Sequence, residues 1–564
     1  MNKRQAKISR ITAEGSPWEI QEVETRGGKN KWFVNGPQSL RELFEENLSD
    51  ETFFVYNGEQ YTYRDIYKKA SSLAYQLQRT HGVKPGDRVA ICMRNYPEWP
   101  IALEAITSIG AIAVAMNAWW QSEEMEYALN LTGVTVMIAD DERISRVMKL
   151  SRATDLKIIS VRCGVLDFAT PIESLIESNE PMPPVSINPD DDAVILFTSG
   201  STGHPKGSVS SHRNILAALL SWEVDFLLNL NLPDSHFRME EFFSEPANRE
   251  IALLAMPLFH VNGMHAVLLS AYRQQRMIIS MYKWDPEVAA EIIDREKVTT
   301  VLGTPAITGD LVEYAKRTNR NLKSLRSTGG GGAARATSQV EEIGKALENA
   351  VPFTGWGMTE TNSIGTGIYG QEYVENPTSS GKCSVVLEIA TVDEGGNLLP
   401  QGERGELVVR GTSVIRGYWN RPDANKESFI DDWFRTGDIA FIDELGYLFV
   451  VDRLKQLIIR GGENIGCGEV EDALLDHSAI IEACAYGVPD QRLGEAVAVS
   501  IYTDSDLADE AILQFLKSRL AQFKIPQHIR MCASQLPRVA SGKIDRRCLR
   551  DMHIEELKPA NSEC

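Results

Sequence analysis

Several features that mark common protein classes are scarce in this sequence or absent from it. Its 564 residues include only eight cysteines, and no two of them form a Cys-x-x-Cys pair or a short regular spacing. The nine histidines are scattered, and the one close pair, His260 and His265, fits no familiar zinc spacing. The cysteines therefore indicate reduced, mostly buried thiols rather than a disulfide framework, and neither residue type predicts a zinc site.

An excess of positive charge is also lacking. The chain has 58 Lys and Arg residues against 78 Asp and Glu residues, which gives a formal net charge of −20. Nucleic acids and anionic membranes are polyanions, so this charge argues against either as the main partner. An anionic ligand must therefore be bound by basic residues that are concentrated at its site.

Long uninterrupted apolar runs are missing as well. The most apolar window, from Ile101 to Trp120, is broken by Glu104, Gly110 and Asn117. This composition favours a buried helix followed by a strand over a membrane-spanning segment. The basic residues near the N-terminus have no apolar core behind them, unlike a secretory signal. We therefore expect a cytoplasmic protein without an integral membrane segment.

What the sequence does contain is an alternation of strand-like and helical patterns without an internal repeat. Residues 53–62 predict a hairpin around Asn-Gly, and Thr62 with Asp65 predicts the capping box of the helix that follows. A strand is predicted over residues 88–93, and strand–helix units continue past Val301. The pattern is that of an α/β protein with parallel sheets.

The length of the chain exceeds a single ordinary core, so more than one domain is expected. From about Val385, short strands separated by glycine turns predict a smaller β-rich subdomain. After Arg453 a compact α+β segment of roughly 110 residues follows, which is enough for a core of its own. We therefore predict a large N-terminal body of several subdomains over residues 1–452 and a mobile α+β C-terminal lid over residues 453–564.

The most informative stretch follows the apolar run 193–197. It consists of Thr198, Ser199, Gly200, Ser201, Thr202, Gly203, His204, Pro205, Lys206 and Gly207. Glycines let backbone N–H groups approach phosphate oxygens, hydroxyls add donors, and the lysine adds a point charge. The stretch predicts a phosphate-binding loop, but not a Walker loop, in which Ser or Thr follows the lysine and a helix begins.

Six motifs, this loop included, resemble those of the adenylate-forming acyl-CoA synthetase superfamily and occur in that family's order. The other five are residues 256–260 (Met-Pro-Leu-Phe-His), 355–360 (Gly-Trp-Gly-Met-Thr-Glu), 435–438 (Arg-Thr-Gly-Asp), 452–455 (Asp-Arg-Leu-Lys) and 537–546. The resemblance implies that a carboxylic acid reacts with ATP to give acyl-AMP and pyrophosphate. The acyl group then passes to coenzyme A with release of AMP.

The resemblance also implies roles for single residues at an ATP site. The loop 198–206 is expected to hold the β and γ phosphates, Thr359 to donate to the α-phosphate, and Glu360 to ligate Mg²⁺, with Thr198 as a second candidate ligand. The residues expected around the nucleoside are the ribose-binding Asp438, the nearby Arg453, the side-chain-poor run of Gly330, Gly331, Gly332 and Ala333, and Trp356, which would stack on adenine.

Two positions of the lid are implied by the same resemblance. In the first, Lys543 is expected to offset the charges of the α-phosphate and the carboxylate during adenylation. Lys455 is expected to be the hinge. After rotation, the loop with Gly461 and Gly462 is expected to meet the pantetheine arm of CoA, because glycines allow close approach of a narrow ligand.

The acid pocket is the part that the sequence specifies least. Its expected lining is Val261, Asn262, Gly263, Met264, Gly303, Thr304 and Pro305. These residues are mostly small or apolar, and none could read the charges of an amino acid, so an aliphatic or aryl-alkyl acid is expected, with medium or long chains first. His260 would orient the carboxylate, gate the pocket or merely pack beside it.

Three interpretations remain open at this point. The first is a CoA ligase, the second an acyl-AMP ligase that serves a carrier protein or another acceptor, and the third a nonenzymatic binder. The third would be expected to lose Lys543, Glu360 or Asp438, which are all present. The expected partners are the small-molecule acid, ATP and CoA, and a homodimer is left open. The acidic and aromatic segment 227–250 predicts a surface insertion, a wall of the acyl entrance or a dimer contact.

Overall fold

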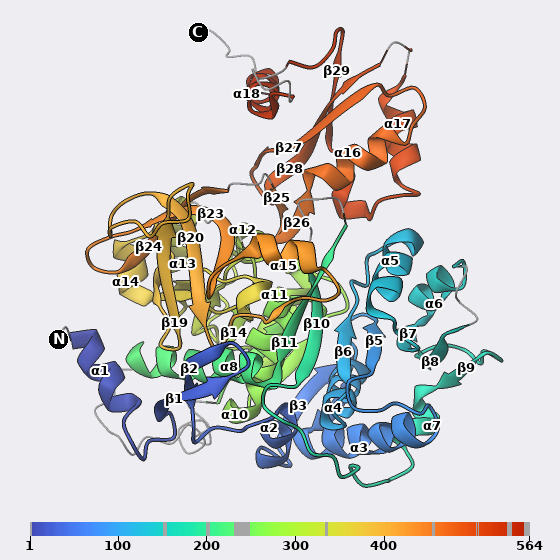
Figure 1. Cartoon of the computed structure of the whole chain (residues 1–564), viewed down its shortest axis with the longest axis vertical. Coiled ribbons are helices and arrows are strands. Elements are labelled where there is room, and N and C mark those ends of the chain that lie inside the picture. The colour runs from blue at the N-terminus through green and yellow to red at the C-terminus, as the bar shows by residue number, and fades with distance from the viewer. Residues whose placement is uncertain are drawn as a thin grey trace.

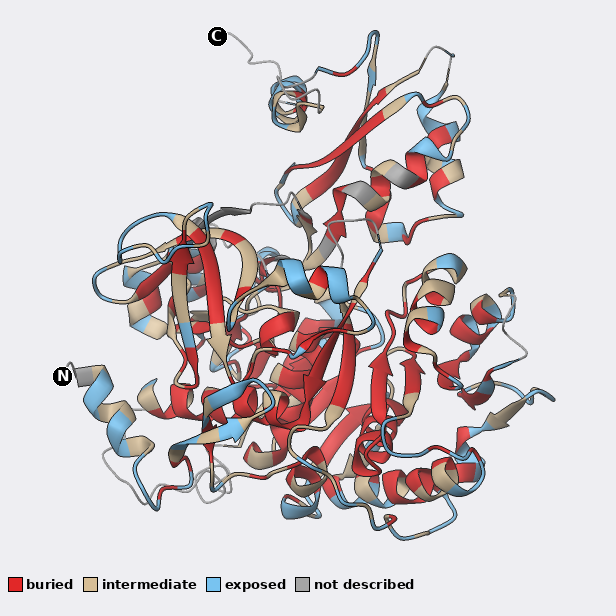
Figure 2. Cartoon of the chain, in the orientation of Figure 1, coloured by how far each residue is buried: buried red, intermediate tan, exposed pale blue. Residues whose placement is uncertain are grey.

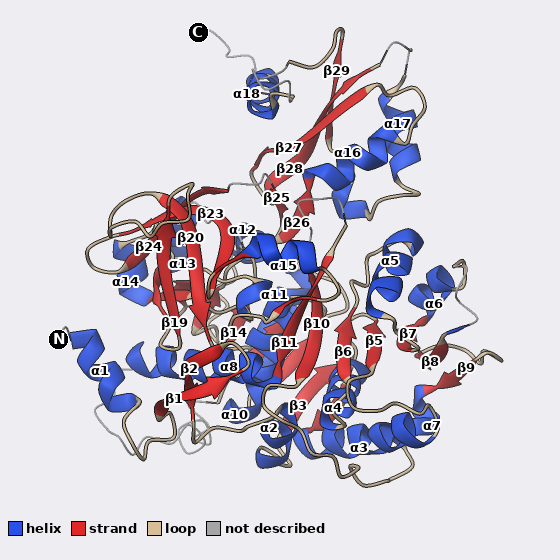
Figure 3. Ribbon diagram, viewed as in Figure 1, coloured by secondary structure: helices blue, strands red, loops and turns tan. Residues whose placement is uncertain are grey.

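The computed structural model of the chain describes residues 3–150, 155–198, 204–229, 249–332, 337–453, 457–503, 505, 507–537 and 544–557. Within these ranges two large sheets form a body, and a smaller sheet forms a C-terminal domain that lies to one side of it (Figures 1 and 3). The expected α/β body and α+β C-terminal domain are therefore confirmed. The boundary at residues 452/453 stays a prediction.

The first sheet of the body is largely parallel and has eight strands. From one edge to the other they are β21 (Gly417–Tyr418), β11 (Lys206–Ser211), β10 (Asp192–Thr198), β6 (Ile112–Ala115), β5 (Arg88–Cys92), β7 (Val136–Asp140), β8 (Lys157–Val161) and β9 (Ala169–Pro171). The helices that accompany it are α3 (Tyr63–Arg79), α4 (Glu98–Ser108), α5 (Ser122–Thr132), α6 (Asp141–Val147) and α7 (Ile172–Ile176). Only β11 and β21 run antiparallel to their neighbours.

The second sheet has fourteen strands. In spatial order they are β19 (Leu387–Val392), β20 (Gly405–Gly411), β23 (Trp433–Ile442), β24 (Tyr447–Arg453), β18 (Gly381–Cys383), β17 (Thr366–Tyr369), β16 (Val351–Thr354), β15 (Ser327–Gly329), β14 (Thr300–Leu302), β12 (Ile251–Leu254), β13 (Met277–Ser280), β3 (Thr52–Tyr56) and β4 (Glu59–Thr62), with β22 (Phe429–Ile430) beside β23. The helices of this part are α8 (His212–Asn229), α10 (Ala271–Gln274), α11 (Pro286–Glu296), α12 (Pro305–Thr318), α13 (Thr337–Ala346), α14 (Gly370–Glu375) and α15 (Pro422–Ser428).

The β-rich part after Val385 is present but is not a separate sheet. Its strands β19, β20, β23 and β24 are antiparallel to one another, and β24 pairs with β18. Because β18 pairs with β17 and β17 with β16, the antiparallel part continues into the parallel strands without a break. The strands between the glycine turns were predicted correctly. That they join the sheet of the body through β18 could not be predicted, because this pairing links residues far apart in the sequence.

The C-terminal domain is built on a five-stranded sheet. Its order is β26 (Glu463–Gly466), β25 (Leu457–Arg460), β28 (Gly494–Tyr502) and β27 (Glu482–Asp490), with β29 (His528–Cys532) parallel to β28. Its helices are α16 (Cys467–Leu475), α17 (Asp509–Leu516), the short 3₁₀ turn η4 (Gln522–Lys524) and α18 (Arg546–Leu557). Apolar side chains on both faces of the sheet make two local cores. Cys467 is packed in one of them, and burial raises the pKa of its thiol to about 12.

The remaining elements lie at the N-terminal end. They are α1 (Lys3–Ile11), the hairpin of β1 (Ile20–Thr25) and β2 (Gly28–Phe33), and α2 (Leu40–Glu46). None of the helices in the described ranges combines the length and the low polarity that crossing a membrane requires.

The main core lies between the two large sheets, where Figure 2 shows buried ribbon on both sides. Helix α4 contributes to this core, and all eleven of its residues are buried. This explains why the window from Ile101 was the most apolar of the chain: the helix has no solvent face. The capping box of Thr62 and Asp65 is also present and starts α3 as expected.

Glu104 of α4 is among the ionisable groups that are buried in the body. It is 1% exposed and accepts a hydrogen bond from the Tyr272 hydroxyl. The Tyr272 ring lies against the rings of Phe44, Phe53 and Tyr63. Burial raises the pKa of the Glu104 carboxyl to about 8, and the hydrogen bond from Tyr272 opposes that rise only in part. Glu104 is therefore protonated at neutral pH.

We expect Glu104→Gln to gain stability relative to the parent protein as the pH rises. Between the ordinary carboxyl pKa of 4.5 and about 8, the folded parent holds a proton that the unfolded chain releases. Stability of the parent must fall with rising pH in this window, and the carboxamide has no such proton to lose. Thermal unfolding at pH 5, 6.5 and 8 measures the difference in Tm between the two proteins. A difference that does not change with pH would contradict a protonated Glu104.

Candidate functional site

The structure describes part of the predicted site. The residues that fall within the described ranges are Thr198, Lys206, His260, Gly330, Gly331, Gly332, Trp356, Thr359, Glu360, Asp438, Gly461 and Gly462, and Arg453 through its main chain alone. Ser199, Gly200, Ser201, Thr202, Gly203, Ala333, Lys455 and Lys543 lie outside the described residues, as do residues 230–248 of the segment 227–250. Their predicted roles stay predictions.

The phosphate-loop motif joins two antiparallel strands. Thr198 at the end of β10 pairs with Lys206 at the start of β11 in an antiparallel register. No helix begins at the lysine, which distinguishes the motif from a Walker loop as expected. On its other side β11 pairs with β21, where Ser208 lies opposite Tyr418.

Tyr418 connects the loop lysine to the predicted magnesium ligand. The Lys206 Nζ lies 4.7 Å from the centre of the Tyr418 ring, in cation–π geometry. The Tyr418 hydroxyl donates a hydrogen bond of 2.7 Å to Glu360 Oε1. Burial, and secondly the Glu360 charge, raise the pKa of Tyr418 well above its ordinary value, so the hydroxyl keeps its proton. Tyr418 was not among the residues predicted for the site, since its only signal in the sequence is an aromatic pair after Gly417.

The Glu360 carboxylate fits a magnesium ligand chemically. It is 5% exposed, in the short 3₁₀ turn η3 (Thr359–Thr361), with its main-chain carbonyl held by Ile415 N–H. Mg²⁺ prefers hard oxygen ligands and commonly takes one or two carboxylates together with substrate phosphates and waters. The described ranges hold no group of three or more His, Cys, Asp or Glu that could bind a metal by itself. A Mg²⁺ here would therefore need the phosphates as well as Glu360.

The predicted ribose ligand is held by the predicted adenine-stacking residue. Asp438 on β23 is 3% exposed, and its Oδ2 accepts a 2.8 Å hydrogen bond from Trp356 Nε1. In the sheet, Asp438 pairs with Arg453 of β24, which brings those two predicted residues together through the main chain. Stacking on adenine was the only role predicted for Trp356. In the structure its indole N–H also orients the Asp438 carboxylate.

The glycine run 330–332 has a structural cause. A side chain on Gly330 would place its Cβ 2.4 Å from the Gly303 carbonyl oxygen, and one on Gly331 would lie 2.7 Å from the Gly355 oxygen. These glycines therefore let the chain pass between the ends of neighbouring strands. Gly332, with a φ of +96°, has more space and lies near Asn262. Of the three, Gly332 best retains the predicted role of a bare surface for a ligand.

The predicted acid pocket begins on an unusual helix. Residues Asn262–Leu269 form a π-helix, η2, and such helices are rare and often lie at functional sites. Gly263 is required there, because a Cβ would lie 2.2 Å from the Pro257 carbonyl oxygen. Met264 is fully buried and belongs to the main core. Its place in the core makes it a support of the pocket rather than an open lining residue.

The glycine loop of the C-terminal domain reaches this pocket. His260 Nε2 lies 2.7 Å from Glu463 Oε1, and the Thr304 hydroxyl lies 3.3 Å from the Gly461 carbonyl oxygen. An ideal Cβ on Gly462 would lie 2.1 Å from Thr304 Cγ2, and its φ is +89°. Only glycine fits at that position, because the main chain of one domain lies directly against a side chain of the other.

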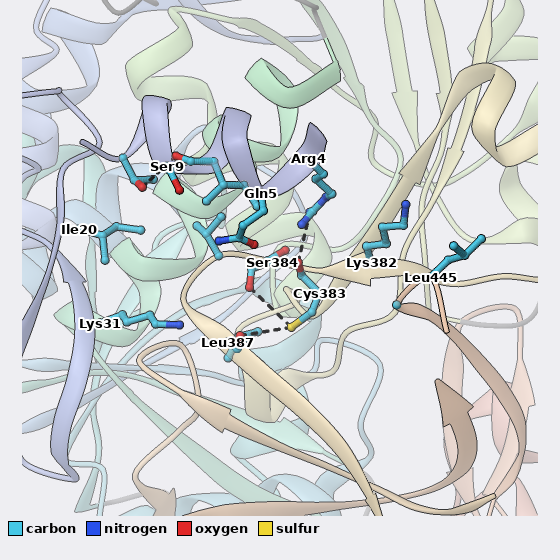
Figure 4. Close-up of a pocket in the computed structure, with 14 residues that line it drawn as sticks. Arg4, Gln5, Ser9, Ile20, Lys31, Lys382, Cys383, Ser384, Leu387 and Leu445 are labelled. Atoms are coloured by element: carbon cyan, nitrogen blue, oxygen red, sulfur yellow. Dashed lines mark hydrogen bonds between the residues drawn. The ribbon is translucent and has the colours of Figure 1, made fainter. Parts of the chain in front are cut away.

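A separate hollow of about 440 Å³ lies between α1 and the strand β18 (Figure 4). Three cations line it, Arg4, Lys31 and Lys382, and each lies 3.2 to 3.8 Å from a carboxylate oxygen. Cys383 also lines the hollow and is half-buried, and desolvation raises the pKa of its thiol to about 12. The three cations are therefore paired, the thiol keeps its proton at neutral pH, and none of the predicted site residues lines the hollow.

Two family models match the chain. The model described as AMP-binding enzyme covers residues 42–419, and that described as AMP-binding enzyme C-terminal domain covers residues 469–543. A feruloyl-CoA synthase from Amycolatopsis sp is 34% identical over 87% of this chain and 93% of the relative. A long-chain-fatty-acid–CoA ligase from Salmonella typhimurium is 30% identical over 91% of this chain and 94% of the relative.

Among solved structures, the o-succinylbenzoate–CoA synthetase of Bacillus subtilis is similar in two states. A double mutant bound to a CoA product analogue matches with a TM-score of 0.78 and 26% identity, over 91% of this chain and 98% of that chain. The complex of the same enzyme with ATP and magnesium ion matches with a TM-score of 0.63 and 27% identity, over 91% and 99%. The present structure is therefore closer to the product-analogue complex.

The bond between Trp356 and Asp438 generates a prediction about nucleotide affinity. Trp356→Phe keeps an aromatic ring but removes the donor that fixes the carboxylate, so ATP should bind about fivefold more weakly, which corresponds to roughly 1 kcal/mol for one hydrogen bond. Asp438→Ala should weaken ATP binding further, by about 1.5 to 3 kcal/mol, because the charge-assisted hydrogen bonds from the carboxylate to the ribose would be lost.

Trp433→Phe is the matched control for this prediction. Trp433 lies on the same strand as Asp438 but stacks on Arg410, and its replacement should leave ATP binding unchanged. Equilibrium ATP binding by calorimetry measures all three variants. Unchanged affinity in both Trp356→Phe and Asp438→Ala would mean that the ribose is held elsewhere.

Proposed function

This chain belongs to the family of AMP-binding enzymes, and we propose that it activates a medium- or long-chain fatty acid and transfers the acyl group to CoA. Family and relatives make it an acyl-CoA synthetase, a ligase that uses ATP and CoA. The observation that carries the proposal is the assembly of Lys206, Tyr418 and Glu360 at one place and of Gly462 against Thr304 at another. The first suits a polyphosphate and the second a narrow thiol arm.

In the first step, a carboxylate oxygen attacks the α-phosphorus of ATP, and pyrophosphate leaves as its bond to that phosphorus breaks. Two anions must meet, so the step needs positive charge and fixed donors. We assign Lys206 and its loop to the β and γ phosphates, Thr359 to the α-phosphate and Lys543 to the charge that develops between the reactants. Mg²⁺, held by Glu360, would supply further charge neutralisation.

In the second step, the thiol of CoA attacks the acyl carbonyl carbon and AMP leaves. The thiol must then reach the acyl group while the adenylating lysine is absent. The contact of Gly462 with Thr304 supports an arrangement in which the glycine loop lines the thiol path. Helix α18 lies on the flank of the C-terminal domain, apart from the body (Figure 1). The higher TM-score to the CoA-analogue complex agrees with this arrangement.

The identity of the acid is the finer part of the proposal. Small and apolar residues such as Val261 and Gly303 favour an acid with a long apolar part. An aryl acid is the second candidate, because the relative at 34% identity is a feruloyl-CoA synthase. Delivery to a carrier protein is the alternative to CoA transfer. We place the enzyme in the cytoplasm, since its described cysteines are free, and leave a homodimer open.

We expect acids of about six to sixteen carbons to release pyrophosphate faster than acetate or any amino acid, because each buried CH₂ contributes about 0.8 kcal/mol. The panel should include ferulate and related aryl acids, with acyl-CoA followed by mass spectrometry. Acetate or an amino acid as the best substrate would contradict the proposed pocket. Acyl-AMP that accumulates without transfer to CoA would favour the carrier-protein alternative.

The two steps should separate in mutants of the predicted lid. Lys543→Ala should slow acyl-AMP formation about a hundredfold while leaving transfer from supplied acyl-AMP nearly intact, as expected for a lost transition-state donor. Lys455→Pro should do the reverse, because proline fixes φ near −65° at the residue that must absorb the rotation. Single-turnover assays of each step decide this. Equal loss of both steps in both variants would refute the assignment of the two residues to different steps.

A further inference from the structure

A buried cluster of three charges joins the C-terminal domain to the body. Lys524 Nζ lies 2.5 Å from Glu469 Oε1 and 2.5 Å from Glu124 Oε1. Exposed fractions of the three side chains are 5%, 13% and 9%, respectively. We call these three residues the Lys524 cluster. A cation this deeply enclosed is rare without partners, and here it has two.

The members of the cluster come from both domains. Lys524 on η4 and Glu469 on α16 belong to the C-terminal domain, so their contact moves with that domain as a unit. Glu124 belongs to α5 of the body, which lies at the upper edge of the body below the C-terminal domain in Figure 1. The other oxygen of Glu124 accepts from the Gln121 N–H in a capping box, which fixes the carboxylate in place.

Aromatic side chains cover the cluster. The ring of Phe523, next to Lys524, lies 5.6 Å from the ring of Trp119 in the body. The Phe523 carbonyl accepts a 2.8 Å hydrogen bond from Arg460 Nη1, which ties η4 to the glycine loop. The ion pair across the domains is therefore shielded from water and adjoins the element that contacts the acid pocket.

Burial makes this contact energetically different from an ordinary surface ion pair. Two carboxylates share one ammonium, and burial together with the Glu124 charge raises the pKa of Glu469, while Lys524 opposes that rise. The two carboxylates hold the pKa of Lys524 above its ordinary value despite desolvation. Removing one partner from a buried pair is costly because the remaining charge stays uncompensated. Arg492 pairs with Asp310 across the same domains, and there the arginine is 59% exposed while the aspartate is 8% exposed, so water screens the pair from the side of the cation.

We propose that Glu124 and Lys524 are positioning residues for acyl transfer, which hold the C-terminal domain in the orientation that presents its glycine loop to the acid pocket. The proposal rests on the two-step function proposed above. A contact of 2.5 Å cannot survive a rotation of the domain, so adenylation requires the Glu124–Lys524 pair to separate. Lys524 then keeps Glu469 as its partner, and the pair across the domains forms again for transfer.

Glu124→Gln is the decisive variant. A glutamine at this position can still close the capping box, and the pair of Lys524 with Glu469 stays intact, so both domains should fold. We expect transfer from supplied acyl-AMP to CoA to slow tenfold or more in single turnover. Acyl-AMP formation, measured as pyrophosphate release in single turnover, should be unchanged or faster.

Two controls match this variant. Glu123→Gln removes the same charge one residue earlier in the first turn of α5, from an exposed side chain that does not belong to the cluster, and should leave both steps unchanged. Arg492→Gln removes a pair across the domains whose cation is largely exposed, and Asp310 keeps its hydrogen bond from Trp284 Nε1, so this variant should change transfer less than twofold. A fluorescence-transfer pair placed on body and C-terminal domain through unnatural amino acids should report loss of the transfer orientation in Glu124→Gln alone.

The outcomes separate this proposal from the proposed function. Transfer at the parent rate in Glu124→Gln, or equal slowing of both steps, overturns the positioning role. Slowing in Glu123→Gln as large as in Glu124→Gln also overturns it, because the effect would then come from the charge of α5. If the parent protein forms no acyl-AMP from any acid of the panel, the proposed function fails instead.

Discussion

Negative charge is the constraint on which this structure depends, because an already acidic chain of net charge −20 must gather further anions at its site. It meets the constraint by holding its own charges in fixed partnerships. Tyr418 contacts the Lys206 ammonium through the face of its ring and the Glu360 carboxylate through its hydroxyl, and it thereby fixes the positions of both groups.

The contact between domains uses two different physical means. At the acid pocket the contact is steric, since Gly462 allows the main chain of one domain to reach Thr304 of the other. At the Lys524 cluster it is electrostatic and depends on exclusion of water. A steric contact limits where the C-terminal domain can sit, and a buried charge pair determines how strongly it prefers to sit there. Together they define the orientation of the C-terminal domain in this structure.

Local features of the fold could be predicted from the sequence, and contacts between distant residues could not. The capping box of Thr62 and the hairpin before it depend on neighbouring residues, and both formed as expected. The bond of Tyr418 to Glu360 spans 58 residues, and that of Trp356 to Asp438 spans 82, so each exists only because of sheet order.

The candidate site shows the same division. Its motifs identified Glu360, Asp438 and the glycine loop as candidates. They did not identify the side chains that position these groups, which are Tyr418, Trp356 and Thr304. The π-helix at Asn262–Leu269 was not predicted from the sequence, and neither was the close approach of Gly263 to the Pro257 carbonyl oxygen. The run at Gly330 was interpreted as a surface for a ligand, whereas its first two members are glycine because neighbouring main chain leaves no space.

The two-residue strand β21 has a consequence for how the protein is made. It covers the outer edge of β11, yet about two hundred residues of chain separate the two strands. During synthesis the phosphate-loop hairpin must therefore wait, with an open β edge, until Tyr418 has emerged from the ribosome. Open edges pair readily with other chains, so the nascent protein is exposed to misassembly during this interval.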